Sequence, residues 1–158
     1  MKKKTLIFLA AAFLLLITTI LGWFYWKSEY SIGSVGTRII DEIDKSSEEN
    51  CFIELNTVTD FEWDTVVVMS ADFLAAGYSD ETVSKMFGVS YKMPDGFRSR
   101  MIFVNDGKIV HEESYRAEVE HSSKFNINIQ HPYYVILTSD DCDVVGSESD
   151  GYYSIFVE

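Results

Sequence analysis

The histidines are the side chains best suited to metal binding or proton transfer, and they lie ten residues apart, at His111, His121 and His131. Zinc ligands on a single element are much closer together, as in the H-E-x-x-H motif. The segment HEESY (111–115) lacks the second histidine of that motif. This spacing favours ordinary surface or core histidines over a zinc site.

A second candidate is the acidic stretch that begins at Asp141. Asp141, Asp143 and Gly146 match positions 1, 3 and 6 of a calcium-binding loop. Val145 and Tyr152, however, occupy positions 5 and 12, where oxygen ligands are required. A solvated acidic loop explains the stretch better, so we expect neither a metal nor a cofactor.

The motifs typical of catalysis are missing. The chain has no G-x-S-x-G motif, no glycine-rich phosphate loop and no catalytic-cysteine context. Glu112 and Glu113 are adjacent in a predicted strand, so their carboxylates should point to opposite faces. We therefore expect a protein that is not an enzyme. A small envelope-associated hydrolase, a metal-dependent enzyme and a small-ligand sensor remain the alternatives.

Two tyrosine pairs suggest a binding surface. Tyr133-Tyr134 and Tyr152-Tyr153 flank the acidic segment Ser139–Gly151, which is predicted to be a loop. In each pair one ring should face the core and the other the solvent. Outward tyrosines are common in protein interfaces, although tyrosine is also simply a good strand residue. The predicted partner surface comprises Tyr133, Tyr134, Asp140, Asp141, Asp143, Tyr152 and Tyr153.

The only two cysteines are Cys51 and Cys142. If they lie outside the cytoplasm they can form a disulfide, which would stabilise the fold by up to about 4–5 kcal/mol for so long a loop. Two buried free thiols are the alternative, because cysteine packs well as a small apolar residue.

An uncharged run of 22 residues, Thr5–Trp26, follows three lysines at positions 2–4. As a helix it would be about 33 Å long, enough to span a hydrocarbon layer of about 30 Å. The lysines predict a cytoplasmic N-terminus, and the aromatic residues 23–26 suit a membrane interface. Residues 1–26 are thus predicted to be a single-pass signal-anchor in the cell (inner) membrane. A signal peptide cleaved near Ser34 is the alternative.

Beyond this run the chain is strongly acidic. Residues 27–158 contain 10 of the 13 lysines and arginines and all 25 aspartates and glutamates, for a formal charge of −15. Such an excess opposes binding to nucleic acid and would steer a basic partner inward, although solubility alone can also explain it. The 132 residues are the usual length of one domain.

Hydrophobic periodicity predicts the elements of this domain. After a tether over 27–36, Thr37–Ser47 has the apolar spacing of a helix, and Ser79 can cap a second helix at Asp80–Phe87. Hairpins are expected at Pro94–Gly96 and Asn105–Gly107. The predicted strands lie at 51–55, 61–70, 89–93, 98–104, 108–115, 125–129, 133–138 and 152–157. The expected fold over 37–158 is α+β: one mostly antiparallel sheet with two short helices.

The N-terminal anchor, the strand FEWDTVVV and the hairpin FVNDGKIV resemble those of small exported, membrane-anchored bacterial proteins of uncharacterised function, over about Phe61–Tyr115. The resemblance implies export but carries no activity or site residue. Together with the charge it leads to one hypothesis: an anchored, periplasmic or extracellular, non-catalytic domain that binds a protein partner. In its sharpest form the domain is an acidic inhibitor or immunity-type protein with a basic partner, and an accessory subunit of an envelope complex is equally compatible with the hypothesis.

Overall fold

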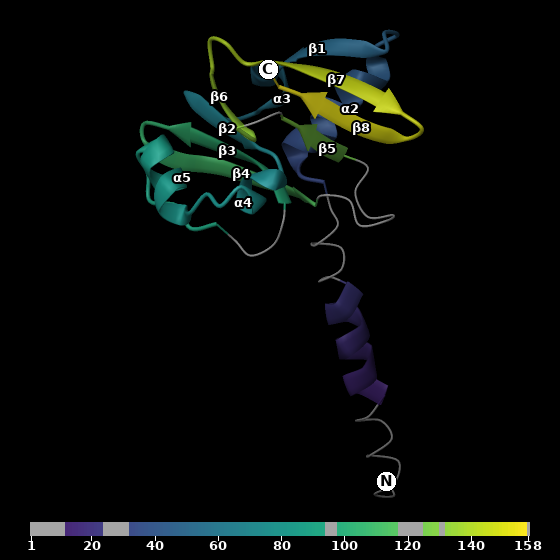
Figure 1. Cartoon of the computed structure of the whole chain (residues 1–158). Coiled ribbons are helices and arrows are strands. Elements are labelled where there is room, and N and C mark those ends of the chain that lie inside the picture. The colour runs from purple at the N-terminus through teal and green to yellow at the C-terminus, as the bar shows by residue number, and fades with distance from the viewer. Residues whose placement is uncertain (1–11, 24–31, 94–97, 117–124, 130–131, 158) are drawn as a thin grey trace, which may run out of the picture. The chain divides into compact units, whose positions relative to one another are not determined.

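The computed structural model describes residues 12–23, 32–93, 98–116, 125–129 and 132–157 (Figure 1). The chain divides into two compact units, Met1–Ser31 and Ile32–Glu158. The described part of the first unit is a helix over residues 12–23. No helix among the described residues is both long and apolar enough to span a bilayer. Residues 5–11 and 24–26 of the predicted anchor lie outside the described residues, so the anchor stays a prediction.

The second unit is an α+β domain with two four-stranded sheets, so the prediction of a single sheet is wrong. Sheet A has the strand order β1-β7-β8-β5 and sheet B the order β4-β3-β2-β6. All neighbouring strands are antiparallel except β5 and β8. The elements in chain order are α2 (Ser34–Lys45), β1 (Asn50–Glu54), α3 (Leu55–Val58), β2 (Thr65–Met69), α4 (Asp72–Ala75), α5 (Asp80–Phe87), β3 (Arg98–Asn105), β4 (Lys108–Arg116), β5 (Phe125–Asn128), β6 (Tyr134–Thr138), β7 (Asp143–Ser149) and β8 (Tyr152–Phe156).

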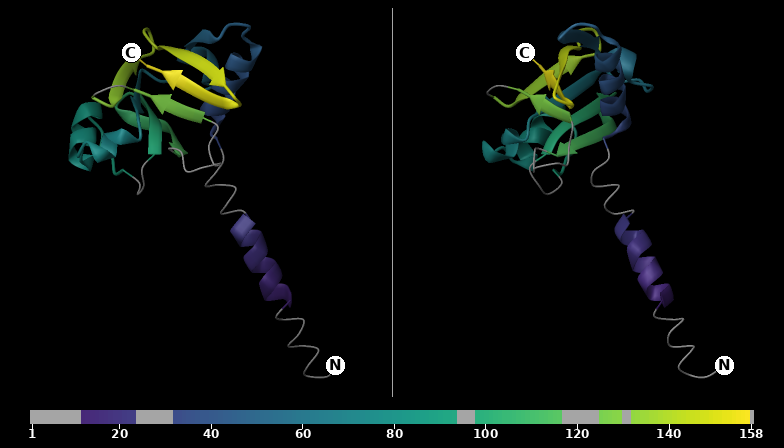
Figure 2. Two further views of the ribbon diagram at one scale, coloured as in Figure 1. Left: turned by 45° about the vertical axis from the view of Figure 1, so that its right-hand side comes forward. Right: turned by 90° about the vertical axis from the view of Figure 1, so that its right-hand side faces the viewer.

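Two apolar cores hold these layers together. The larger one joins α2 to the inner faces of both sheets, and includes Ile39 from α2, Ile155 from sheet A and Phe103 from sheet B. The smaller one lies on the other face of sheet B, where Val67 and Ile102 pack with Phe73 of α4 and Val83 of α5. Figure 2 shows α2 and the α4–α5 pair on opposite sides of the domain in both views. Strand β2 is therefore buried on both faces, which suits its continuous apolar run Val66–Met69.

The segment predicted to be an acidic loop contains a strand, β7, at the centre of sheet A. Val144 and Gly146 face inward and are buried, while Asp143 stays exposed, which is the alternation of a half-buried strand. Asp150 and Gly151 then have φ values of 53° and 80° and form the tight turn to β8. The high acidic content concealed the period of two, so the loop prediction was wrong.

The helices follow the predictions only in part. Helix α5 has the predicted bounds, with the Ser79 hydroxyl accepting a hydrogen bond from Thr82 N and Gly88 ending the helix at φ 66°. Helix α2 starts at Ser34, inside the predicted tether. Two single-turn helices, α3 and α4, were not predicted, and residues 89–93 form no strand. The turn at 94–97 lies outside the described residues.

Candidate functional site: the outer face of sheet A

Sheet A buries one face, and no described residue covers the other. Helix α2 packs against the inner face so closely that a Cβ added at Gly146 would lie 2.7 Å from Ile43 Cγ1. None of the outward side chains is buried, and this set is called the outer face of sheet A below. It comprises Asn50, Phe52, Glu54, Asn126, Asn128, Asp143, Val145, Ser147, Ser149, Tyr152, Ser154 and Phe156.

An apolar row crosses this face. Strand register places Phe52 opposite Val145, and Val145 opposite Phe156. Phe52 is 82% exposed and Phe156 42% exposed, while Val145 between them is half-buried. Single exposed apolar residues are common, but three in one row on an uncovered face form a patch of the kind found at interaction sites.

The charged side chains described on this face have one sign. Glu54 and Asp143 pair in the adjacent row, and both are exposed. The four strands of sheet A contain no lysine, arginine or histidine. A positively charged surface approaching this face would therefore meet no cation on its strands.

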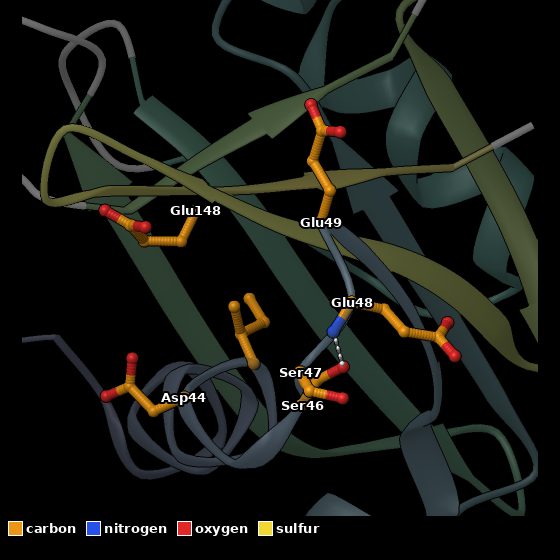
Figure 3. Close-up of a pocket in the computed structure, with 7 residues that line it drawn as sticks. Asp44, Ser46, Ser47, Glu48, Glu49 and Glu148 are labelled. Carbon is orange, nitrogen blue, oxygen red and sulfur yellow. Dashed lines mark hydrogen bonds between the residues drawn. The ribbon is translucent and has the colours of Figure 1, made fainter.

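A hollow of about 290 Å³ lies where the α2–β1 connection meets β7 (Figure 3). It is lined by Asp44, Glu48, Glu49 and Glu148, with Ile43, Ser46 and Ser47. Figure 3 shows the four carboxylates spread around the hollow rather than aimed at one point. Consistent with this, the described residues contain no group of three His, Cys, Asp or Glu that could hold a metal ion. The hollow is thus a region of concentrated negative charge beside sheet A.

The residues of the predicted partner surface lie in three places. Tyr134 packs its ring edge-on against Phe73 and Tyr78 in the smaller core, with ring centroids 5.7 and 5.9 Å away, and Tyr133 is half-buried beside them. Asp140 and Asp141 lie in the β6–β7 connection. Asp143 begins β7, whereas the turn to Tyr152 follows its far end, about 20 Å along the strand. The predicted surface is therefore not assembled as one site.

Three of the predicted residues do belong to sheet A. Tyr152 and Asp143 lie on the outer face, and Tyr152 is 48% exposed. Tyr153 points the other way, and its hydroxyl donates a hydrogen bond to Asp44 Oδ1 at 2.7 Å. That bond raises the pKa of the Tyr153 hydroxyl above its ordinary value.

Both cysteines are free thiols, so the predicted disulfide is absent. Cys51 pairs with Gly146, whereas the Cys142 carbonyl accepts a hydrogen bond from Leu55 N, four residues further along the chain from Cys51. The register therefore separates the two by about 13 Å. A bridge needs Cα atoms within about 7 Å. Burial raises the pKa of both thiols.

The buried carboxylate of Glu113 contacts a histidine and a tyrosine, a combination that also occurs in active sites. Here the carboxylate binds the N-terminus of helix α2. It accepts hydrogen bonds from Val35 N at 2.8 Å and Gly36 N at 3.1 Å, at the N-terminus of α2. His111 Nε2 and the Tyr115 hydroxyl contact it at 2.9 and 2.6 Å, and Ser34 Oγ at 3.2 Å. Burial alone would raise the pKa of Glu113, but the bonds from Tyr115, His111 and the two backbone N–H groups together lower it. His121 and His131 lie outside the described residues.

Glu112 points to the opposite face of sheet B, as predicted from its adjacency to Glu113. There its Oε1 contacts Arg100 Nη1 at 3.2 Å and accepts a hydrogen bond from the Tyr91 hydroxyl at 2.6 Å. Burial, followed by this bond, raises the pKa of Tyr91. The Arg100 guanidinium is also bonded to Ser114 Oγ at 3.0 Å. The Tyr91 bond fixes the segment after α5 to sheet B.

Phe52 is the functional candidate that the sequence interpretation passed over. It alternates with Cys51 and Ile53, so the strand pattern already assigns it to the polar face, beside Glu54. A phenylalanine on that face is an anomaly visible without a structure.

Comparison with known proteins adds nothing further, because no family model, no curated protein and no solved structure matches this chain.

Proposed function

We propose that this chain is a membrane-anchored, extracytoplasmic domain that acts by binding another protein and not by catalysis. The observation that carries the proposal is the uncovered apolar row Phe52–Val145–Phe156. Burying a fully exposed phenylalanine is worth about 1.5–3 kcal/mol, so a protein gains by covering this row. The three residues support the proposal because they form one row, in which Phe52 is 82% exposed; a single exposed side chain would not.

The anchor rests on the uncharged run 5–26 and the lysines before it. The described helix over 12–23 supports it, because consecutive apolar side chains from Phe13 to Leu16 are 58–69% exposed. Four consecutive positions cover every side of a helix, and an apolar surface all round is typical of a segment surrounded by lipid. The proposed location is the cell (inner) membrane, with the domain periplasmic or extracellular.

The sharpest form of the proposal is an acidic inhibitor or immunity-type protein that neutralises a basic partner. The charge of −15 over residues 27–158 supports this form. A single acidic surface that steers a basic enzyme or toxin onto itself needs no catalytic groups of its own. A gene for a basic secreted protein next to the gene for this chain would favour it strongly.

Two measurements on the full chain test the proposal. A reporter fused after Glu158 that fluoresces only in the cytoplasm should stay dark, and bright fluorescence from membrane-bound protein would contradict the topology. Purification from native membranes should co-isolate a protein in fixed ratio with the chain, and the Phe52→Ser variant should lose it. Isolation of the chain alone, under mild detergent and low salt, would contradict a binding function.

A further inference from the structure

We infer that the outer face of sheet A is the contact surface, and that its occupant is a protein whose own contact surface is positively charged. This inference rests on the proposed binding function and adds to it the place of contact and the chemistry of the partner. Phe52 is the central contact, and the acidic groups around sheet A set the orientation of the partner.

The outer face of sheet A is smaller than the area that a stable interface buries. Four strands about 4.8 Å apart and about five residues long give a sheet face of roughly 300 Å² in projection. A stable interface buries about 800 Å² on each partner. The occupant therefore extends past the sheet edges, one of which is strand β1.

The charges along edge strand β1 select the sign of the partner. Glu54 ends the strand, two residues after Phe52, so the two side chains lie on the same face. Asp143 pairs with Glu54, which doubles the negative charge at that end. An apolar centre with acidic groups at its rim matches a partner that presents an apolar pocket ringed by lysine or arginine.

The same charges disfavour the other occupants of such a face. A second copy would bring the same excess of negative charge, −15 over residues 27–158, and like charges oppose association. An anionic lipid surface would likewise repel Glu54 and Asp143. A neutral protein could cover the apolar row but would leave the flanking carboxylates desolvated and unpaired.

The test uses site-specific photo-crosslinking in the organism that encodes the full-length chain. Benzoylphenylalanine replaces Phe52 on the outer face in one strain, and Ile136 in a matched control strain. Ile136 is an exposed apolar residue too, 44% exposed, but lies on β6 of sheet B. Both side chains are exposed, so the substitution leaves the core of the domain unchanged. The crosslinked species are identified by mass spectrometry.

The expected result is a crosslink from position 52, and none from position 136, to a protein with an isoelectric point above about 9. Its yield should fall at least threefold in a chain that also carries Glu54→Gln and Asp143→Asn, and fall again in about 0.5 M salt, where charges farther apart than a few ångströms are screened.

Each other result overturns a defined part of the account. A protein crosslinked from position 136 alone is consistent with the binding function but shows that the outer face of sheet A is not the contact surface. A crosslink from position 52 to an acidic or neutral protein, to lipid, or to a second copy of the chain overturns the positively charged partner. No protein crosslinked from either position, with none co-isolated from native membranes, overturns the binding function itself.

Discussion

Replacing Glu113 with glutamine tests how helix α2 is held on the domain. The Glu113 side chain is 4% exposed and lies at the N-terminus of the helix. The N-cap residue there is Gly33, which has no side chain that could cap the helix. Glu113 Oε1 accepts from Val35 N and Glu113 Oε2 from Gly36 N. Glutamine keeps one oxygen and turns an NH₂ group toward the other donor, so one buried N–H loses its acceptor.

The size of the effect follows from these contacts. A buried donor without an acceptor costs about 1–3 kcal/mol. The remaining bonds, which include those from His111 and Tyr115, lose the strengthening that an ionised acceptor gives. Together we expect Glu113→Gln to lower the free energy of unfolding by about 3–4 kcal/mol, and the melting temperature by about 10–15 °C for a domain of this size.

Thermal unfolding of the full chain in detergent, followed by circular dichroism at pH 7, measures this change. Glu49→Gln is the matched control, because Glu49 is exposed and should change the free energy of unfolding by less than about 0.5 kcal/mol. A Glu113→Gln variant within about 1 kcal/mol of the wild type would refute the view that this carboxylate holds α2.

The pH dependence gives a second reading of the same contact. The pKa of Glu113 lies below its ordinary value of 4.5 in the folded chain, so the folded state favours the ionised form. Its contribution to stability is therefore present above about pH 4.5, and is lost as the pH falls through the lower, folded-state pKa. The difference in stability between wild type and Glu113→Gln should shrink as the pH falls from about 4.5 toward 3. A constant difference over this range would contradict the argument.

Three further predictions concern other parts of the fold. In the native protein, Cys51 should react with a thiol reagent, while Cys142, which is 2% exposed, should react only on unfolding. Reductant should leave the melting temperature unchanged, and a melting temperature that falls with reductant would show that the two cysteines form a disulfide after all. Gly146→Ala should destabilise the domain by about 1–3 kcal/mol in urea unfolding, because the new Cβ would lie 2.7 Å from Ile43 Cγ1 and 2.8 Å from Ile53 Cδ1. The control Ser147→Ala, on the outer face, should have little effect. Equal effects would refute the packing of α2 on sheet A. Gly151→Ala should destabilise by about 1–2 kcal/mol in the same assay, since φ is 80° there, and a neutral result would contradict the turn between β7 and β8.

The elements that local sequence specified were predicted well. The valine run of β2, the Ser79 cap and Gly88 stop of α5, and the Asp106-Gly107 turn each act within a few residues, and each is present. The Asp150-Gly151 turn carries the same signal as Asp106-Gly107, so β7 and its hairpin were within reach. The acidic residues 139–151 were interpreted by charge when their alternation was the better guide.

The features that depend on distant partners could not be predicted in this way. Helix α2 begins at Ser34 because Glu113, 79 residues away in sequence, caps it. The division into two sheets depends on β1 pairing with β7 while β2 pairs with β3 and β6, which periodicity does not specify. The tyrosine pairs failed as a single surface for the same reason, since β6 and β8 belong to different sheets.

The most direct test of the central claim is the affinity of the crosslinked partner, once purified, for three forms of the full-length chain in detergent: wild type, Phe52→Ser and Ile136→Ser. The outer face of sheet A as the contact surface predicts at least a tenfold loss of affinity for Phe52→Ser, the usual effect of truncating a central aromatic contact. Ile136→Ser should bind as the wild type does, and all three should have the same melting temperature. Equal affinity of Phe52→Ser and wild type would contradict the claim.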